Sequence, residues 1–348
     1  MNLFESLVRP NVLKMKPYSS ARDEFKGTAK VFLDANESPF PNGLNRYPDP
    51  LQRSLKAELG AYFGVYGEQI LLGNGSDEPI DLLIRAFCEP NRDHILITPP
   101  TYGMYEVCAN TNSVSVINAP LDLDYQLQTE ALIERLNDCV KLVFLCSPNN
   151  PTGNLLDEKS ILQITDATKG LVIVDEAYAD FSGFSMLKHL PSRPNLVVLK
   201  TFSKAWGLAA IRLGMLIAHP DVLFWLNRIK APYNINRMTM DCASQILNQK
   251  GTVAQQVQQI VEEKNRLVSF LESSVLVNHV FPSQANFVLV RFKDVQKVFQ
   301  HLLSEGIVVR NRSNLPECLG CLRISVGLPA ENNMLMQALR ALERTQSL

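Results

Sequence analysis

The stretch NLVVLKTFSKAWGLAAIRLGMLIAHP, residues 195–220, contains two short apolar runs separated by a polar loop. The runs NLVVLK and RLGMLIAHP are typical of buried strands in their length and apolar content. The loop between them carries Lys204, and Arg212 begins the second run. We therefore predict two strands whose connection presents charged and hydroxyl side chains.

Upstream of this stretch the same pattern recurs, and each apolar run ends in polar or turn residues. These runs are QILLGNGSDE (69–78), DHILITPPTY (93–102), VKLVFLCSPNN (140–150) and GLVIVDEAY (170–178). Helical patterns such as PIDLLIRAF and DEKSILQITDAT lie between them. Near-continuous apolar strands that alternate with helices predict an α/β fold with a large, mostly parallel sheet sandwiched by helices. Open sheets of this class bind ligands at the carboxyl ends of their strands, where the polar residues gather here.

The pattern changes after about residue 232. A helical stretch over 237–273 precedes the short strand patterns ANFVLVRF, GIVVR and CLRISVG, and the helical pattern ENNMLMQALRALE follows them. We predict a smaller α+β domain. The expected division is a large domain over 41–235 and a discontinuous small domain over 1–40 plus 236–348.

The composition of the 348 residues excludes some classes of protein. The 34 basic and 35 acidic residues give a net charge of -1, which argues against a nucleic-acid surface. No membrane span or secretory signal is apparent, and the seven scattered cysteines fit a reducing compartment. Cys318 and Cys321 have C-x-x-C spacing without a second pair or clustered histidines, so we predict free thiols and no metal site. We expect a soluble, cytoplasmic protein.

Lys204 is the strongest candidate for catalysis. A lysine amine can form a Schiff base with an aldehyde, and its pKa falls readily in partly buried, cationic surroundings. The neighbouring Thr201, Ser203 and Arg212 suit a phosphate group close by. A surface lysine at a strand-to-helix turn is the alternative, because S-x-K alone does not decide between the two.

Three further candidates follow the strands that precede Lys204. Asp175 can pair with a protonated heterocyclic nitrogen, and Tyr178 can donate to a phenolic oxygen. In SPNNPTG (147–153), two prolines and a glycine favour a rigid turn that fixes Asn149 as a donor to a ligand oxygen. The alternatives are an N-cap or turn aspartate and an ordinary turn.

The segment GNGSDEPIDLLIRAF (73–87) predicts a strand, a glycine turn and a helix. It departs from G-x-G-x-x-G and from G-x-x-x-x-G-K, which disfavours a dinucleotide or nucleotide-triphosphate site. Free amides at Ser76 and Asp77 in the predicted helix N-terminus can hold a phosphate. Tyr102, just beyond the next strand, can stack on a flat cofactor or simply pack in the protein.

The order of these features carries more weight than any one of them. The series GSDE, Tyr102, SPNNPTG, VDEAY and TFSKAWGLAAIRLG resembles the fold-type I pyridoxal-phosphate aminotransferases. Outer motifs extend the resemblance to the histidinol-phosphate aminotransferase family: MKPYSSARDEF (15–25), LDANESPF (33–40), RYPDP (46–50), GIVVRNR (306–312) and CLRISVG (321–327). Family members more often carry LAGLR where this chain has LAAIR (208–212), and ANENP where it has ANESP. Neither departure removes a cofactor ligand, but Ala210 can change packing at the cofactor phosphate.

The resemblance implies pyridoxal 5'-phosphate as the cofactor and assigns roles to three catalytic residues. Lys204 would form the Schiff base and carry the proton between the substrate α-carbon and the cofactor. Asp175 would keep the pyridine nitrogen protonated. Tyr178, together with Asn149, would bond the cofactor's O3′. The remaining cofactor contacts would be Ser76, Asp77, Tyr102, Thr201, Ser203, Arg212 and, at the phosphate of a partner subunit, Tyr47.

The substrate contacts are expected at two arginines. Period-2 alternation in CLRISVG places Arg323 opposite the apolar face, and Arg310 ends the strand GIVVR. Guanidinium groups pair with phosphate or carboxylate, although either arginine can instead have a structural partner. The resemblance adds Tyr18 and Asn36 near the substrate.

The expected activity is transamination between histidinol phosphate and 2-oxoglutarate, giving imidazole-acetol phosphate and glutamate in histidine biosynthesis. The alternatives are a phosphothreonine-type decarboxylase or an aromatic aminotransferase of the same fold, and a non-enzymatic ligand-binding protein is disfavoured because Lys204 and Asp175 are present. A homodimer with shared active sites is implied by the resemblance.

Overall fold

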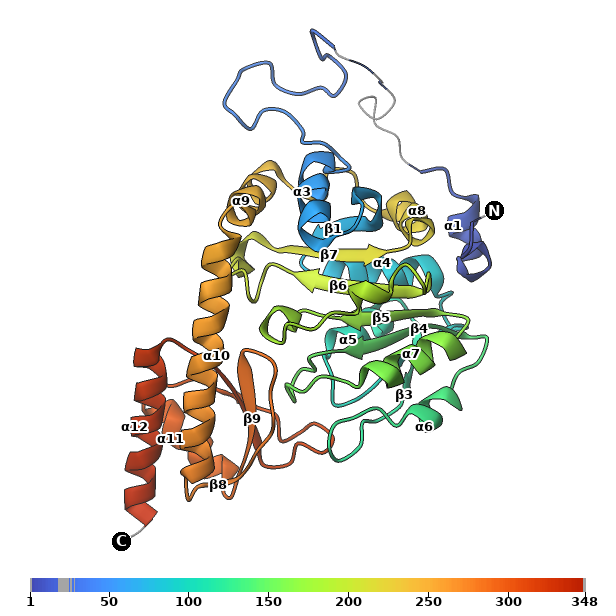
Figure 1. The fold of residues 1–348 in the computed structure, drawn as a ribbon. Coiled ribbons are helices and arrows are strands. Elements are labelled where there is room, and N and C mark those ends of the chain that lie inside the picture. The colour runs from blue at the N-terminus through green and yellow to red at the C-terminus, as the bar shows by residue number, and fades with distance from the viewer. Residues whose placement is uncertain (1, 18–24, 26, 28, 347–348) are drawn as a thin grey trace.

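A seven-stranded sheet forms the centre of the computed structural model, which describes residues 2–17, 25, 27 and 29–346 (Figure 1). Its strand order is β1-β7-β6-β5-β4-β2-β3. The bounds are β1 Ile70–Asn74, β2 His94–Ile97, β3 Ser115–Asn118, β4 Val140–Cys146, β5 Leu171–Asp175, β6 Leu196–Thr201 and β7 Leu213–Ala218. β7 is antiparallel to both of its neighbours, and the other neighbouring pairs are parallel. The predicted, mostly parallel sheet is therefore confirmed.

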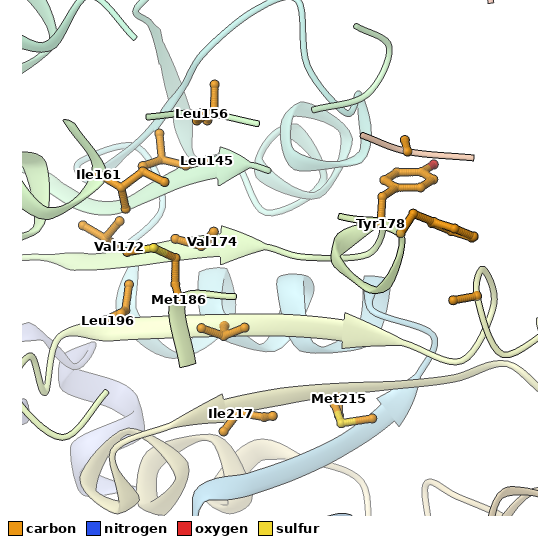
Figure 2. Packing of buried hydrophobic residues seen from close by; sticks show 14 of the residues in the cluster. Leu145, Leu156, Ile161, Val172, Val174, Tyr178, Met186, Leu196, Met215 and Ile217 are labelled. Atoms are coloured by element: carbon orange, nitrogen blue, oxygen red, sulfur yellow. The ribbon is translucent and has the colours of Figure 1, made fainter. Parts of the chain in front are cut away.

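Helices cover both faces of this sheet because its strands are apolar on both sides. Along β5, Val172 and Val174 belong to one buried cluster, while Leu171 and Ile173 belong to another. Figure 2 shows Val172 and Val174 packed with Ile161 of α7. The helices of this part are α3 Arg53–Phe63, α4 Asp77–Phe87, α5 Met104–Thr111, α6 Thr129–Ile133, α7 Glu158–Ala167 and α8 Pro220–Ile229. Buried residues of α4, α5 and α8 lie in the second cluster.

A second, smaller sheet follows in the C-terminal part, with the order β10-β11-β9-β8 and antiparallel pairing throughout. Its strands are β8 Val277–Val280, β9 Phe287–Phe292, β10 Arg310–Asn311 and β11 Cys321–Ser325, and its helices are α11 Val295–Ser304 and α12 Pro329–Gln346. The expected helical stretch over 237–273 consists of α9 Arg237–Leu247 and the long α10 Lys250–Ser273. In Figure 1, α10 leads from the large sheet to the small one.

The N-terminal segment lies against the large sheet domain. Phe4, Val8 and Val12 join the core cluster that contains α4 and α8, and the Arg9 amide donates to the Ala86 carbonyl at 3.0 Å. The short helix α1 Pro10–Lys14 is part of this segment. The expected place of residues 2–14 in the small domain is therefore wrong, because their apolar side chains are buried on the large one. The rest of the predicted division stays a proposal.

No helix in the described part of the chain combines the length and apolar character that crossing a membrane requires. All seven cysteines are free, and Cys318 and Cys321 are both buried.

Candidate active site

A cavity of about 220 Å³ lies where the carboxyl ends of β4, β5 and β6 meet the loop between β6 and β7. Its lining combines residues of the large sheet with two arginines from the small one. The lining residues are Ser76, Asp77, Tyr102, Cys146, Asn150, Asp175, Ala177, Tyr178, Thr201, Ser203, Lys204, Arg212, Arg312 and Arg323. Ten of the fifteen predicted site residues are among them, so the strand-end pattern in the sequence located this cavity.

One end of the cavity is built to hold an anion. α4 begins at Asp77, and Arg212 reaches toward this helix N-terminus, with Nη2 3.4 Å from Asp77 Oδ2 and Nη1 3.5 Å from Ser203 Oγ. Gly75 has φ of +67° and its amide donates to the Arg212 carbonyl at 2.7 Å. A Cβ at Gly75 would lie 2.4 Å from Arg212 Nη2, so only glycine allows the guanidinium this position. Helix amides and a guanidinium at one point are groups that can hold a phosphate.

Asp175 is the last residue of β5 and lies buried at the cavity wall. Its Oδ2 accepts from the Tyr105 hydroxyl at 2.7 Å, and its Oδ1 accepts from the Ala177 amide at 3.1 Å. Burial raises the pKa of Asp175 to about 6, while these two bonds oppose the rise. No cation pairs with this carboxylate among the described residues, so the site suits a ligand that brings a protonated nitrogen.

Lys204 lies in the loop after β6 and opens onto the cavity. Its Nζ lies 5.4 Å from the centre of the Tyr178 ring, and within the described chain it has no hydrogen bond or ion pair. Burial, followed by the charge of Arg323, lowers the pKa of Lys204, and Asp175 opposes this effect. The lowered pKa gives a larger neutral, nucleophilic fraction of the amine at neutral pH.

Two tyrosines and a threonine complete the predicted set on the large sheet. The Tyr102 hydroxyl donates to Asp77 Oδ1 at 3.0 Å, which leaves its ring at the cavity wall. The Tyr178 side chain is buried, and its ring meets Phe287 edge-on at 5.1 Å. Thr201 Oγ1 donates to the Leu213 carbonyl at 3.3 Å, across the loop that carries Lys204.

The prediction for Asn149 is wrong, because this buried side chain is hydrogen-bonded within the protein and does not line the cavity. Its Nδ2 donates to the Pro100 carbonyl at 2.8 Å and to Thr152 Oγ1 at 2.7 Å. The cavity is instead lined by Asn150, whose Nδ2 lies 3.5 Å from the Tyr178 hydroxyl. In a tight turn, adjacent side chains point in different directions, and SPNNPTG contains two asparagines that the sequence pattern does not distinguish.

The β10–β11 region of the small sheet contributes two arginines to the cavity, and a third lies nearby. Arg323 of β11 lines it and donates from Nη1 to Asn150 Oδ1 at 2.5 Å. Arg310 stands opposite Arg323 in the β10–β11 ladder but is exposed and does not line the cavity. Arg312, which the sequence analysis did not select, lines it. Period-2 alternation after Arg310 is the signal that could have identified Arg312.

Tyr47 and Asn36, two of the predicted outer residues, do not line the cavity of their own chain. Tyr47 is 51% exposed and stacks on Tyr233 at 4.5 Å. Asn36 is exposed beside Tyr47 on a separate surface hollow that also includes Met238. Tyr18 lies outside the described residues. The expected role of Asn36 near the substrate has no support within one chain.

The comparisons with known proteins agree with this geometry. The model of the family "Aminotransferase class I and II" matches residues 22–339. This chain belongs to that family. It is 51% identical to the histidinol-phosphate aminotransferase of Parabacteroides distasonis, over 98% of this chain and 99% of that protein. The corresponding enzyme of Cytophaga hutchinsonii is 47% identical over 97% and 98% of the two chains.

A solved structure gives the same result for the fold. The crystal structure of the histidinol-phosphate aminotransferase from Clostridium acetobutylicum superposes with a TM-score of 0.81 at 27% identity, covering 87% of this chain and 92% of that one. The predicted family, the transaminase class and the pyridoxal-phosphate cofactor are confirmed.

Proposed function

We propose that this transaminase exchanges the amino group between histidinol phosphate and 2-oxoglutarate, giving imidazole-acetol phosphate and glutamate. One observation carries the proposal: Lys204 and Asp175 open onto a single cavity that also contains Arg212 and Arg323. An amine, a buried carboxylate and separate guanidinium groups are what a phosphorylated cofactor and anionic substrates require. The identity to relatives with this activity supports the choice of substrate.

The residues fit pyridoxal phosphate at three points. The buried Asp175 carboxylate suits the pyridine nitrogen, the α4 N-terminus with Arg212 and Ser203 suits the phosphate, and Lys204 suits the aldehyde carbon. We place Tyr102 against the ring, with Ser76, Asp77 and Thr201 completing the cradle. When bound, this cofactor supplies an aldehyde that condenses with amines and a ring that withdraws electrons.

The chemistry of the chain's own groups follows from their surroundings. Lys204, with its lowered pKa, would take the proton from the substrate α-carbon and deliver it to carbon C4′ of the bound cofactor. Asp175 in its ionised form stabilises a positive charge on the ring nitrogen. Asn150 and Tyr178 lie close enough to each other to share one ligand oxygen, and we assign them to O3′ of the cofactor.

The half-reaction with each substrate tests the proposal. Histidinol phosphate should convert the aldehyde form of the cofactor to its amine form, and 2-oxoglutarate should restore it. Borohydride reduction of the resting enzyme should attach the cofactor to the peptide that contains Lys204. Failure of histidinol phosphate to change the spectrum would contradict the proposed substrate, and release of carbon dioxide from phosphothreonine would favour the decarboxylase alternative.

We further propose a cytoplasmic homodimer in which Tyr47 of one subunit reaches the cofactor phosphate of the other. Support comes from residues 29–52, the segment before α3, which extends away from the sheets in Figure 1. This segment leaves large apolar side chains in solvent. Leu33 is 91% exposed and Phe40 is 79% exposed. Apolar side chains exposed together in this way mark an interaction surface.

Mixing two inactive variants tests shared sites. Lys204→Ala and Tyr47→Ala each lack one component, so a mixed dimer would contain one site with both defects and one site with neither. Activity should return on mixing after subunit exchange, to at most about half of a wild-type dimer. No recovery, in subunits that a pull-down proves to be mixed, would contradict the shared site.

A further inference from the structure

Three arginines share one face of the β10–β11 ladder. Arg310 and Arg323 are direct cross-strand partners. Arg312 lies two residues beyond Arg310, so period-2 alternation puts it on the same face, and its amide donates to the Cys321 carbonyl at 2.9 Å. Among the described residues, none of the three forms an ion pair with a carboxylate. Arg312 and Arg323 are half-buried, and neighbouring positive charges without a counter-charge are unfavourable there unless a ligand anion joins them.

Arg312 differs from the other two arginines in having an unsatisfied donor. Within the described part of the chain, its Nε is buried and has no hydrogen-bond partner. Arg323 by contrast bonds Asn150 and lies over the Phe287 ring at 5.2 Å. Burial, followed by the charges of Arg323 and Arg310, lowers the pKa of Arg312. A buried N–H without a partner costs free energy, which a ligand oxygen in the cavity would offset.

We propose that Arg312 determines specificity for the phosphorylated substrate and contributes little to the reaction with glutamate. This inference rests on the proposed function. A phosphate monoester has a charge between about -1.5 and -2 at pH 7 and three acceptor oxygens, whereas a carboxylate has one charge and two oxygens. Of the two carboxylates of glutamate, the one that takes the place of the phosphate needs only one bidentate guanidinium, for which Arg323 suffices. The additional charge and oxygen of the phosphate are what Arg312 binds.

The two half-reactions, measured separately by stopped-flow on the holoenzyme, test this assignment. Arg312→Gln should lower the second-order rate constant with histidinol phosphate by about 10- to 100-fold and change that with glutamate by less than about 2-fold. Arg312→Lys should recover part of the loss, because it keeps the charge without the planar fork. Arg193→Gln is the matched control, since Arg193 pairs with Asp166 on the surface.

The pH dependence gives a second readout that a purely structural role would not change. Because the second pKa of a phosphate monoester is about 6, the wild-type preference for histidinol phosphate over glutamate should rise between pH 5 and about 7. This rise should be much smaller in Arg312→Gln. An equal loss with both substrates, or no loss with either, would overturn the proposal.

A third measurement separates this proposal from the proposed function. Inorganic phosphate should inhibit the glutamate half-reaction of the wild-type holoenzyme, and Arg312→Gln should weaken this inhibition by about 10-fold while inhibition by acetate stays unchanged. If wild-type enzyme fails to react with histidinol phosphate, the proposed function is wrong, and the phosphate result still decides the role of Arg312. Equal inhibition of the wild type and Arg312→Gln by phosphate would then overturn the proposed role of Arg312.

Discussion

The two walls of the cavity are built in different ways. The wall from the large sheet places Asp175 at the end of β5 and Lys204 in the loop after β6, and the residues of both strands are buried throughout. The opposite wall comes from β10, which has only two residues, and from β11. Its arginines are exposed or half-buried. The first wall is therefore held by strands of a large sheet, and the second by the short edge strand β10 and its neighbour β11.

This difference fits the demands on each wall. The large-sheet wall faces a cofactor that stays in place, so its groups benefit from fixed positions. The small-sheet wall has to accept two substrates in turn, and long guanidinium side chains at a sheet edge can adapt to either. Changes in the first wall should then affect both half-reactions, and changes in the second should separate them.

The largest effect is expected at Lys204. Lys204→Ala should slow both half-reactions by about 10⁴-fold or more, because it removes the group that moves the proton. Single-turnover spectra measure the loss, and a small added amine should restore part of the rate. Lys169→Ala is the control, since that exposed lysine pairs with Asp138 on the surface. A loss of rate with only one of the two substrates would contradict the expectation that both half-reactions depend equally on the first wall.

Arg323 lies on the second wall, but we expect its loss to affect both half-reactions. Arg323→Gln removes the guanidinium that bonds Asn150. The variant should lower the binding affinity for both substrates by about 100-fold, because each substrate loses a charge-assisted ion pair. Apparent affinities from the two half-reactions measure this effect. If only the reaction with histidinol phosphate is affected, Arg323 and Arg312 would have the same role, and the proposed difference between them would be wrong.

Tyr105 tests how the first wall controls the charge of Asp175. Affinity for the cofactor requires the ionised carboxylate, so it falls as the pH drops below the raised pKa of about 6. Tyr105→Phe removes a bond that favours the carboxylate, which raises this pKa further and should move the loss of affinity to higher pH by about 1 unit. Cofactor titration of the apoenzyme between pH 5 and 8 measures the shift.

Tyr125→Phe is the matched control for this experiment. Tyr125 is also buried, but its hydroxyl donates to the Glu317 carbonyl outside the cavity. An unchanged pH dependence in Tyr105→Phe would mean that Tyr105 does not act through Asp175.

The smallest effects are expected from two glycine substitutions, one next to the cavity and one in a helix away from it. Gly75→Ala introduces a Cβ that displaces Arg212 and requires a positive φ, so cofactor affinity should fall by about 10-fold and stability by about 1 kcal/mol. Gly251→Ala lies in α10 with open space around it and should instead raise stability by about 0.5 to 1 kcal/mol. Denaturant unfolding and cofactor titration separate the two, and equal affinities would show that Arg212 tolerates displacement.

Predictions from the sequence succeeded where a residue's position follows from a strand. Asp175 and Lys204 come directly after apolar runs, and the carboxyl ends of parallel strands meet at one edge of the sheet. They failed for Asn149, because the direction of a side chain in a turn depends on which hydrogen bonds its neighbours offer. Here the carbonyl of Pro100 and the hydroxyl of Thr152 hold Asn149, and Asn150 takes the position at the cavity.

The sequence by itself determined where the strands lie along the chain and which chemical groups follow them, because hydrophobic periodicity and turn residues are local properties. Only the tertiary structure decided which arginines share the cavity and where the N-terminal segment packs. Arg312 and Arg323 are brought to Lys204 by pairing between strands far from it in the chain. Phe4, Val8 and Val12 are apolar enough for either domain, and their burial against α4 and α8 depends on the shape of a surface that no local pattern encodes.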